Sequence, residues 1–355
     1  MNLQPTASPE SPAPRKLRIA ILGSGNIGTD LLLKVRRSPL LECSLFIGRN
    51  LASPGMAKAN SLGVRISDKS IGAIEDDPDC CDLVFDATLA RDHLKHWPIL
   101  ERLGKMVIDM TPAKLGTMCI PAINLEDSLQ GRNANMVTCG GQASIPIAWA
   151  IGQTHPEVEY IEVVSSIASR SAGPATRINI DEYLETTEGG ISKFSGCKDA
   201  KAILVLNPAQ PCIDMQTTVF ARVQNPDIEA LQVAVDDIVA KIQPYVPGYE
   251  LLLSPVLENG RIVVMVKVRG LGDYLPAFAG NLDIINCAAI AAAEAYAKQF
   301  LGLGDGHDPA TMANRSHKDV ETAQEAALTK TERAASASAH PLVAGGMGVH
   351  ANGSA

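Results

Sequence analysis

A short apolar stretch that runs directly into a glycine-rich turn constrains the fold of this chain more than any other feature. Residues 17–22 read Leu-Arg-Ile-Ala-Ile-Leu, and residues 23–28 read Gly-Ser-Gly-Asn-Ile-Gly. Apolar side chains then recur at helical spacing between residues 27 and 35. A buried parallel strand, a tight turn and a helix, in this order, are typical of the first unit of a dinucleotide-binding sheet.

The three glycines of this turn have separate physical roles in such a unit. Gly23 permits the tight turn, Gly25 lets the backbone approach a pyrophosphate, and Gly28 allows the helix to pack closely on the strand. The N-terminus of the helix offers free N–H groups and a positive dipole end to the phosphates. The alternative is a glycine-rich loop that binds nothing, and the position between a strand and a helix argues against it.

Strands and helices continue to alternate as far as about residue 140. Apolar runs predict strands at residues 43–47, 83–86, 106–109 and 135–138, and a helical pattern covers residues 92–103. Alternating strands and helices indicate a parallel sheet with helices on both faces, which is a doubly wound α/β fold.

The pattern changes after Trp149, because the strands gain one polar face. Alternation of apolar and polar residues predicts strands at 160–168, 202–206, 217–223 and 261–268, and helices at 180–190 and 227–242. One-sided strands with covering helices indicate an α+β second domain on a mostly antiparallel or mixed sheet. An alanine-rich helix predicted at residues 281–301 is expected to pack back against the first domain.

These patterns divide the chain into two folded domains and two tails. We predict a Rossmann-type dinucleotide-binding domain at residues 16–140 and 278–302, and an α+β catalytic domain at residues 141–277. Residues 1–15 lack periodicity and are predicted to be disordered, as is most of the tail at residues 303–355.

Charge and composition exclude several classes of partner. The formal net charge is −8 and aromatic residues make up 4% of the chain, which argues against nucleic acid, since its recognition needs basic surface and stacking aromatic rings. The same charge argues against an anionic membrane surface. No apolar run is long enough to span a bilayer and the N-terminus has no secretory pattern, so we expect a cytoplasmic protein.

The eight cysteines are spread along the chain and form no CxxC pair, which indicates reduced thiols. One of them lies in a setting suited to nucleophilic chemistry. Cys139 is predicted to end a strand, with Gly140 and Gly141 forming a sharp turn before a helix. That helix is expected to begin near Ser144 and to hold Pro146 in its first turn. Its dipole would lower the thiol pKa, and the glycine amides could approach an oxyanion.

The alternative for Cys139 is a buried structural cysteine, which is what most of the other cysteines are predicted to be. The sequence shows no obvious general base for the thiol. His93 and His96 are predicted to lie on a surface helix. His155, in a predicted loop before Pro156, is the one ordered histidine that could pair with Cys139.

The end of the second strand carries Arg49 and Asn50, where a dinucleotide-binding sheet commonly has a carboxylate for the ribose hydroxyls. Arg49 could accept the 2′-phosphate of NADP, or it could stack on the adenine and leave either cofactor acceptable. We expect NAD as the cofactor, with NADP as the alternative.

Five motifs follow one another along the chain in a distinctive order. They are Gly23-Ser24-Gly25-Asn26-Ile27-Gly28-Thr29-Asp30, Met136-Val137-Thr138-Cys139-Gly140-Gly141-Gln142-Ala143, Ser171-Ala172-Gly173-Pro174-Ala175-Thr176-Arg177, Asn207-Pro208-Ala209 and Tyr274-Leu275-Pro276-Ala277-Phe278-Ala279-Gly280-Asn281-Leu282-Asp283-Ile284. Over roughly residues 17–300 the chain resembles the acylating acetaldehyde dehydrogenases of aromatic meta-cleavage pathways. Relatives of that family in fold are the glyceraldehyde-phosphate and aspartate-semialdehyde dehydrogenases.

The resemblance implies an activity, partners and a set of site residues. Cys139 would carry the acyl group as a thioester, converting acetaldehyde, NAD⁺ and coenzyme A to acetyl-CoA and NADH. The implied partner is a 4-hydroxy-2-oxovalerate aldolase that hands over acetaldehyde, with a homodimer of this chain inside a heterotetramer. No metal is implied. The implied dinucleotide-binding residues are Ser24, Gly25, Asn26, Ile27, Ser171, Ala172, Gly173, Pro174, Ala175, Thr176, Arg177, Ile178, Asn179 and, beside the nicotinamide, Asn281.

Several details of the chemistry stay open at this point. The family often has an aspartate where this chain has Thr217, so a base role for that carboxylate does not transfer. Arg177 could meet a phosphate or form a structural salt bridge, and apolar residues around Ile180 and Ile203 are expected to line the aldehyde pocket. The alternatives to coenzyme A acylation are an aldehyde dehydrogenase that uses water or phosphate as acceptor, and an inactive Rossmann protein serving as a scaffold or redox sensor.

Overall fold

The computed structural model describes residues 15–303, and the first of its two β-sheets is parallel throughout. Its strand order is β3-β2-β1-β4-β5-β7-β6. The strands are β1 (Leu17–Leu22), β2 (Leu41–Ile47), β3 (Ile66–Ser67), β4 (Leu83–Asp86), β5 (Met106–Asp109), β6 (Thr117–Met118) and β7 (Asn133–Asn135). The chain winds away from β1 in both directions, so the carboxyl ends of β1 and β4 form the crevice where such sheets bind ligands.

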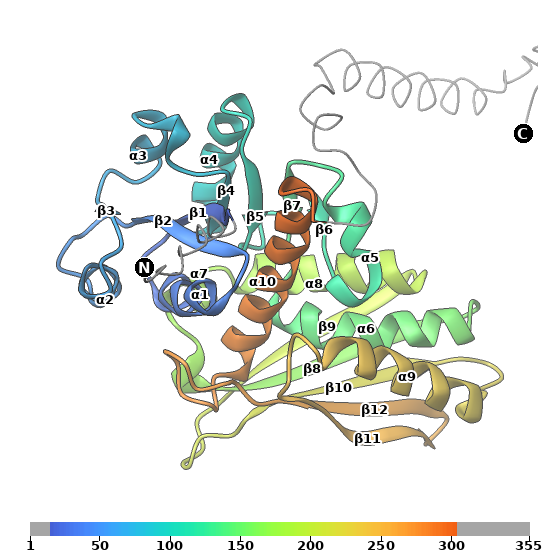
Figure 1. Cartoon of the computed structure of the whole chain (residues 1–355). Coiled ribbons are helices and arrows are strands. Elements are labelled where there is room, and N and C mark those ends of the chain that lie inside the picture. Colours follow the sequence, from blue (N-terminus) through green and yellow to red (C-terminus); the bar gives the residue numbers. More distant parts are fainter. Residues whose placement is uncertain (1–14, 304–355) are drawn as a thin grey trace, which may run out of the picture. The chain divides into compact units, whose positions relative to one another are not determined.

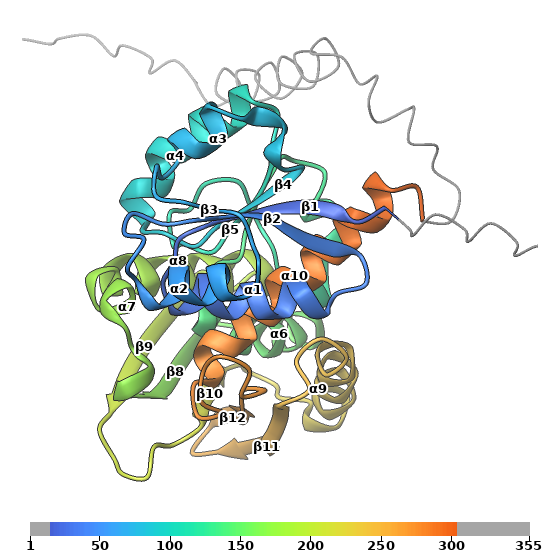
Figure 2. The same ribbon diagram turned by 60° about the vertical axis from the view of Figure 1, so that its left-hand side comes forward.

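Helices cover both faces of this sheet. They are α1 (Asn26–Arg37), α2 (Pro54–Ser61), α3 (Gly72–Glu75), the 3-10 turn η1 (Pro78–Cys80), α4 (Ala90–Arg102), α5 (Pro121–Ser128) and α10 (Gly280–Phe300). Figure 2 shows α1, α2 and α10 on one face and α3 and α4 on the other. Ile19 and Ile21 of β1 share a core with α1, whereas Ala20 and Leu22 share the opposite core with Leu100 of α4. The continuous apolar run therefore fills both faces, as expected for a buried parallel strand.

The second sheet is mixed, with the strand order β11-β12-β10-β8-β9. Its strands are β8 (Tyr160–Ala168), β9 (Asp199–Asn207), β10 (Met215–Arg222), β11 (Tyr249–Glu258) and β12 (Arg261–Val268), and only β8 and β9 pair in parallel. Helices α6 (Cys139–Thr154), α8 (Ile180–Ser195) and α9 (Ile228–Ile242) lie along one face (Figure 1). Burial alternates along β10, so its other face is more exposed. The prediction of a doubly wound sheet with an α+β second domain is confirmed.

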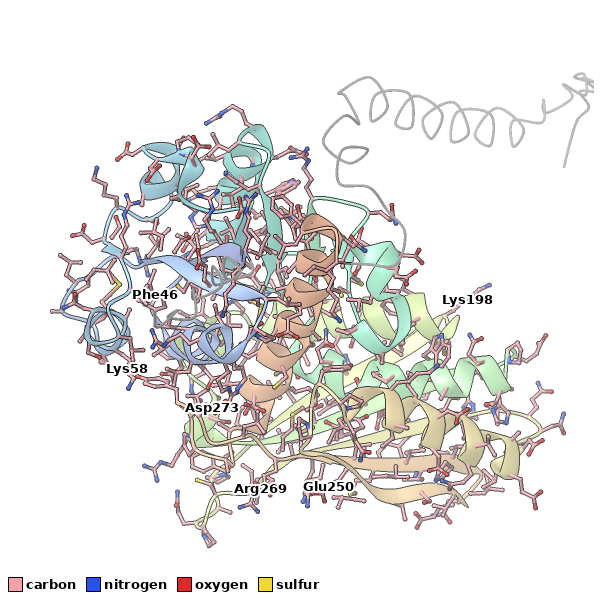
Figure 3. All side chains as sticks on the ribbon, viewed as in Figure 1. Phe46, Lys58, Lys198, Glu250, Arg269 and Asp273 are labelled. Carbon is pink, nitrogen blue, oxygen red and sulfur yellow. The ribbon has the colours of Figure 1, made fainter. Side chains whose placement is uncertain are left out.

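Helix α10 connects the two sheets, and a buried lysine of α1 forms an ion pair with the loop that precedes α10. The ammonium nitrogen of Lys34 in α1 lies 3.0 Å from an Asp30 oxygen, 2.8 Å from Asp273 and 2.7 Å from Asp283. Asp273 lies in the loop between β12 and α10 (Figure 3). Lys34 is only 4% exposed, so these carboxylates provide the charge compensation that a buried ammonium requires.

Two predictions of local structure were wrong. The strand expected at residues 135–138 is instead β7, which ends at Asn135, because Val137 has a left-handed backbone with φ of 61° and cannot continue a strand. His93 and His96 were expected on a surface helix, but both are buried on the face of α4 that meets β4. Most of each predicted disordered tail lies outside the described residues. Within residues 15–303, no helix has both the length and the apolar character needed to cross a membrane.

Candidate active site

Two adjoining cavities open at the carboxyl ends of the parallel strands. The larger has a volume of about 740 Å³ and is lined by the glycine turn, the ends of β2 and β4, and the segment around residues 173–178. The smaller has a volume of about 70 Å³ and extends to Cys139. The residues that line both are Ile27, Thr88, Ala175, Thr176 and Leu282. The larger cavity falls in the size range of cofactor sites, and the smaller one is its continuation toward the cysteine.

The glycine turn has the geometry that its sequence predicted. Gly23 has a φ of +122°, and a Cβ added to Gly28 would lie 1.8 Å from the Gly23 carbonyl oxygen. A Cβ added to Gly25 would meet no protein atom within 4 Å, so packing does not demand a glycine there. Close approach of a ligand does explain it. The turn residues that line the larger cavity include Ser24, Gly25, Asn26 and Ile27.

Asn281 is fully buried at the start of α10, immediately before Leu282, which lines both cavities. Neither its amide nitrogen nor its amide oxygen has a hydrogen-bond partner in the described part of the chain. Leaving a buried polar group unpaired costs about 1–3 kcal/mol. Asn281 itself lines neither cavity, although Leu282 beside it lines both.

Cys139 is the first residue of α6, which corrects the predicted start of that helix near Ser144. Thr138 caps the helix, because its hydroxyl oxygen accepts a hydrogen bond from the Gly141 N–H at 2.8 Å. Pro146 consequently lies inside the helix and not in its first turn. The cysteine is therefore closer to the helix N-terminus than expected, where the dipole favours a negatively charged sulfur.

The sequence nevertheless predicted the wrong direction for the thiol pKa. Burial raises the pKa of Cys139 to about 11, and the hydrogen bonds that its sulfur makes with the Tyr183 hydroxyl and with the backbone N–H groups of Gly140 and Cys139 only partly offset it. Cys139 is 8% exposed, so removal of water from the sulfur outweighs the local hydrogen bonds. Near neutral pH Cys139 rests as a thiol, and attack on a carbonyl requires that its proton be moved.

The hydroxyl groups of Thr217, Ser165 and Tyr183 form a chain of contacts that ends at the Cys139 sulfur. The Tyr183 hydroxyl oxygen lies 3.8 Å from the Cys139 sulfur, and a Cβ on Gly140 would come within 2.0 Å of that oxygen. Gly140 is thus a glycine because the tyrosine hydroxyl occupies the space. The Ser165 hydroxyl lies beside Tyr183 and is 3.0 Å from the Thr217 hydroxyl.

Hydrogen bonds of buried polar side chains fix the backbone just before Cys139. Val137 has a φ of 61°, which is strained for a β-branched residue. Its N–H donates to the Asn135 side-chain oxygen at 2.9 Å, and the Asn135 amide donates to Asp109 at 2.7 Å and to the Thr111 carbonyl at 2.8 Å. These bonds compensate the strain and fix the wall of the smaller cavity.

The segment at residues 171–179 contributes only part of the predicted contacts. Gly173, Pro174, Ala175, Thr176 and Ile178 line the larger cavity, and Asn179 lines the smaller one. Ser171, Ala172 and Arg177 line neither cavity.

Arg177 lines neither cavity, and within residues 15–303 it forms no salt bridge. Its guanidinium donates to the carbonyl oxygens of Ala172 and Ser169, so it stabilises the backbone of the segment that precedes it.

Comparison with known proteins identifies the family. The model of the prokaryotic acetaldehyde dehydrogenase dimerisation domain matches residues 139–276. An acetaldehyde dehydrogenase of Spirochaeta aurantia is 63% identical over 286 residues, which are 81% of this chain and 96% of that protein. The chain belongs to the acetaldehyde dehydrogenase family.

Solved structures of more distant enzymes share the fold of this acetaldehyde dehydrogenase family member. Aspartate semialdehyde dehydrogenase II of Vibrio cholerae, complexed with ASA, has a TM-score of 0.56 at 14% identity, covering 82% of this chain and 100% of that one. The Candida albicans enzyme with NADP has a TM-score of 0.56 at 11% identity, covering 78% and 99%. At such identities the likeness concerns the fold alone.

A buried ionic cluster lies next to the larger cavity, where α4 packs on β4. The Nδ1 atoms of His93 and His96 each lie 2.9 Å from the same oxygen of Asp86, and His93 Nε2 lies 3.4 Å from Asp109. Burial raises the pKa of Asp86, but the hydrogen bonds to both histidines outweigh it and hold the pKa at about 2. Burial raises the pKa of Asp109 to about 7. The cluster explains why two histidines are buried, and His96 lines the larger cavity.

Two further sequence predictions do not agree with the structure. His155 lies at the opposite end of α6 from Cys139, where its Nε2 accepts from the Asp227 N–H at 2.9 Å, so it is a structural residue. Ile203 is 39% exposed on β9, and neither Ile180 nor Ile203 lines the smaller cavity. The apolar side chains that do line it include Met110, Leu282 and Ile285.

Sequence reasoning missed three residues of the site. Thr88 lines both cavities, Arg91 lines the larger one, and Tyr183 touches the Cys139 sulfur. The sequence held no signal for Tyr183, because Gly140, the residue that makes room for its hydroxyl, was already explained by the predicted turn before α6. Thr88 and Arg91 follow β4 at the sheet edge where ligands bind, so their position after a predicted strand could have identified them.

Proposed function

We propose that this chain is a coenzyme A-acylating acetaldehyde dehydrogenase that works through a thioester on Cys139, in the catabolism of aromatic compounds. The observation that carries the proposal is the position of Cys139 at the N-terminus of α6, in a small cavity that continues the cofactor-sized one. The reaction converts acetaldehyde, NAD⁺ and coenzyme A to acetyl-CoA, NADH and a proton. A cavity of about 70 Å³ with apolar walls suits a two-carbon aldehyde.

The chain's own residues support each part of this chemistry. The Cys139 sulfur adds to the aldehyde carbon, and the backbone N–H groups at the start of α6 favour the partial negative charge that builds up on the oxygen during the addition. The walls formed by Met110, Leu282 and Ile285 keep water from the thioester that remains after hydride loss. The thiol of coenzyme A then takes the acyl group and frees the cysteine.

The described residues fit a nicotinamide dinucleotide, which when bound accepts the hydride. Gly25 leaves open space for a pyrophosphate. The resemblance assigns Asn281 to the nicotinamide end, and its amide has no hydrogen-bond partner within residues 15–303. Arg49 and Arg91 line the larger cavity but not the smaller one, and neither guanidinium has a side-chain partner within residues 15–303. NAD is our first assignment. The two arginines favour NADP as a second candidate, because guanidinium groups pair well with a 2′-phosphate.

The proposed assembly is a homodimer that joins a 4-hydroxy-2-oxovalerate aldolase in a heterotetramer. The matched dimerisation model spans the whole second sheet. The face of that sheet away from α6, α8 and α9 exposes Ile203 and Val205 of β9, which is consistent with a protein contact there. The aldolase assignment rests on the resemblance of the five motifs.

The test is the formation of reduced nicotinamide from acetaldehyde, with NAD⁺ or NADP⁺, with and without coenzyme A. We expect strict dependence on coenzyme A and acetyl-CoA as the product by mass spectrometry. Cys139→Ser should bind the dinucleotide and lose turnover, whereas Cys212→Ser, which changes a half-buried thiol outside both cavities, should behave as wild type. Turnover without coenzyme A would replace the proposal with a hydrolytic dehydrogenase, and full activity of Cys139→Ser would exclude the thioester.

A further inference from the structure

We infer that Tyr183 is a catalytic residue that moves the proton when Cys139 adds to the aldehyde. The inference rests on the proposed thioester chemistry. That chemistry needs a group that takes the proton of the Cys139 thiol, and the sequence showed no obvious candidate. Its starting point is the contact of 3.8 Å between the Cys139 sulfur and the Tyr183 hydroxyl oxygen, both of which belong to residues lining the smaller cavity.

The lining of the smaller cavity restricts what else could move this proton. Among residues 15–303, the side chains around that cavity include no carboxylate, imidazole or amine. The groups that can give up a proton are the thiol, the tyrosine hydroxyl and the hydroxyls of Thr88, Thr111, Thr138 and Thr176. The Thr138 hydroxyl is already used as the helix cap of α6, and Tyr183 is the group that touches the sulfur.

Tyr183 is held in place by contacts that leave its hydroxyl facing Cys139. The residue is 6% exposed, and its ring belongs to the main hydrophobic core. Its backbone carbonyl accepts from the Thr187 hydroxyl at 2.7 Å, and that hydroxyl lies 2.7 Å from the hydroxyl of the Thr138 cap. The helix that carries the tyrosine is therefore tied directly to the helix that carries the cysteine.

The proton transfer balances without an external base. As the sulfur–carbon bond forms, the carbonyl π bond breaks and its electron pair moves to oxygen. The thiol proton passes to the Tyr183 oxygen, and the proton of Tyr183 passes to the new oxygen, which gives a neutral hemithioacetal and an unchanged tyrosine. The hydroxyl proton of the hemithioacetal is the proton released in the overall reaction when hydride leaves and the thioester forms. Burial and the neighbouring cysteine raise the pKa of Tyr183 well above its usual value, so the hydroxyl stays protonated and ready to donate. The Ser165 hydroxyl, which is itself paired with Thr217, forms a hydrogen bond with the Tyr183 hydroxyl.

The experiment compares Tyr183→Phe with the wild type, with Cys139→Ser and with the control Tyr296→Phe. The phenylalanine keeps the ring in the core and removes only the hydroxyl. Tyr296 lies near the far end of α10 and stacks on Phe300. Three quantities are measured: kcat/KM for acetaldehyde, the dinucleotide affinity by calorimetry, and the pH dependence of Cys139 alkylation by iodoacetamide, read from the Cys139 peptide by mass spectrometry.

We expect Tyr183→Phe to lower kcat/KM about 100-fold with unchanged dinucleotide affinity, which is the usual size of a general acid–base contribution. Alkylation of Cys139 should shift to higher pH, becoming roughly tenfold slower below the thiol pKa, because the thiolate loses a donor. Wild-type activity of Tyr183→Phe would overturn the inference, as would a loss of activity that accompanies a loss of dinucleotide binding. Activity in Cys139→Ser would instead refute the proposed function, and the alkylation profile would then decide whether Tyr183 acts on the thiol.

Discussion

Two alanine substitutions in the glycine turn should separate the stability of the fold from its capacity to bind a dinucleotide. In Gly28→Ala the new Cβ would lie 1.8 Å from the Gly23 carbonyl oxygen, whereas ordinary contact begins at 3.4 Å, so the atoms must separate by 1.6 Å (3.4 − 1.8). The obstructing atom is backbone, and α1 packs on β1 through the core, so neither side can yield easily. In Gly25→Ala the new Cβ meets no protein atom within 4 Å.

The expected magnitudes follow from these distances. Overpacking typically costs about 1–3 kcal/mol, and the backbone clash of Gly28→Ala places it near the upper end. For a folded unit of this size the melting temperature should fall by roughly 6–10 °C. Gly25 has φ of −79° and ψ of −169°, which alanine can adopt, so Gly25→Ala should retain its stability or gain up to about 1 kcal/mol. Its methyl group stands where a pyrophosphate would approach, so dinucleotide affinity should fall on the order of tenfold or more.

Thermal unfolding followed by circular dichroism without cofactor, and calorimetric titration with NAD⁺ and NADP⁺, test both variants. If Gly28→Ala melts at the wild-type temperature, the helix and strand do not approach as closely as the structure has them. If Gly25→Ala binds both dinucleotides as tightly as the wild type, the backbone at residue 25 does not face a phosphate, and the cofactor assignment of the turn is wrong.

Two further predictions concern the buried charges. Lys34→Met should lower the free energy of unfolding by about 3–5 kcal/mol near neutral pH, because it leaves the carboxylates of Asp30 and Asp283 buried without their cation. Urea unfolding measures this change, and a loss below about 1 kcal/mol would contradict the prediction. Burial raises the pKa of Asp109 from 3.8 to about 7. The contribution of this group to the free energy of unfolding is therefore fully present below about pH 4 and is lost as the pH rises through about 7. Asp109→Asn should remove this loss, and identical pH profiles of urea stability for variant and wild type would rule out the titration.

Several elements could be predicted from the sequence because they depend on local pattern. The apolar run of β1, the glycine turn and the spacing of α1 follow from strand burial, permitted φ values and helical periodicity, all of which are properties of neighbouring residues. The predicted bounds of β4, β5, β8 and β12 agree with the structure for the same reason. The cysteine of the proposed thioester was also singled out locally, by its place between a strand and a helix.

Tertiary structure decided what depends on residues far apart in the chain. The thiol pKa of Cys139 is raised because the folded chain buries the sulfur. His93 became a core residue through pairing with Asp86, which periodicity cannot reveal. Tyr183 stands 44 residues from Cys139 and reaches its sulfur only because α8 packs against α6. Burial and pairing set the protonation of these groups, and both are properties of the folded chain.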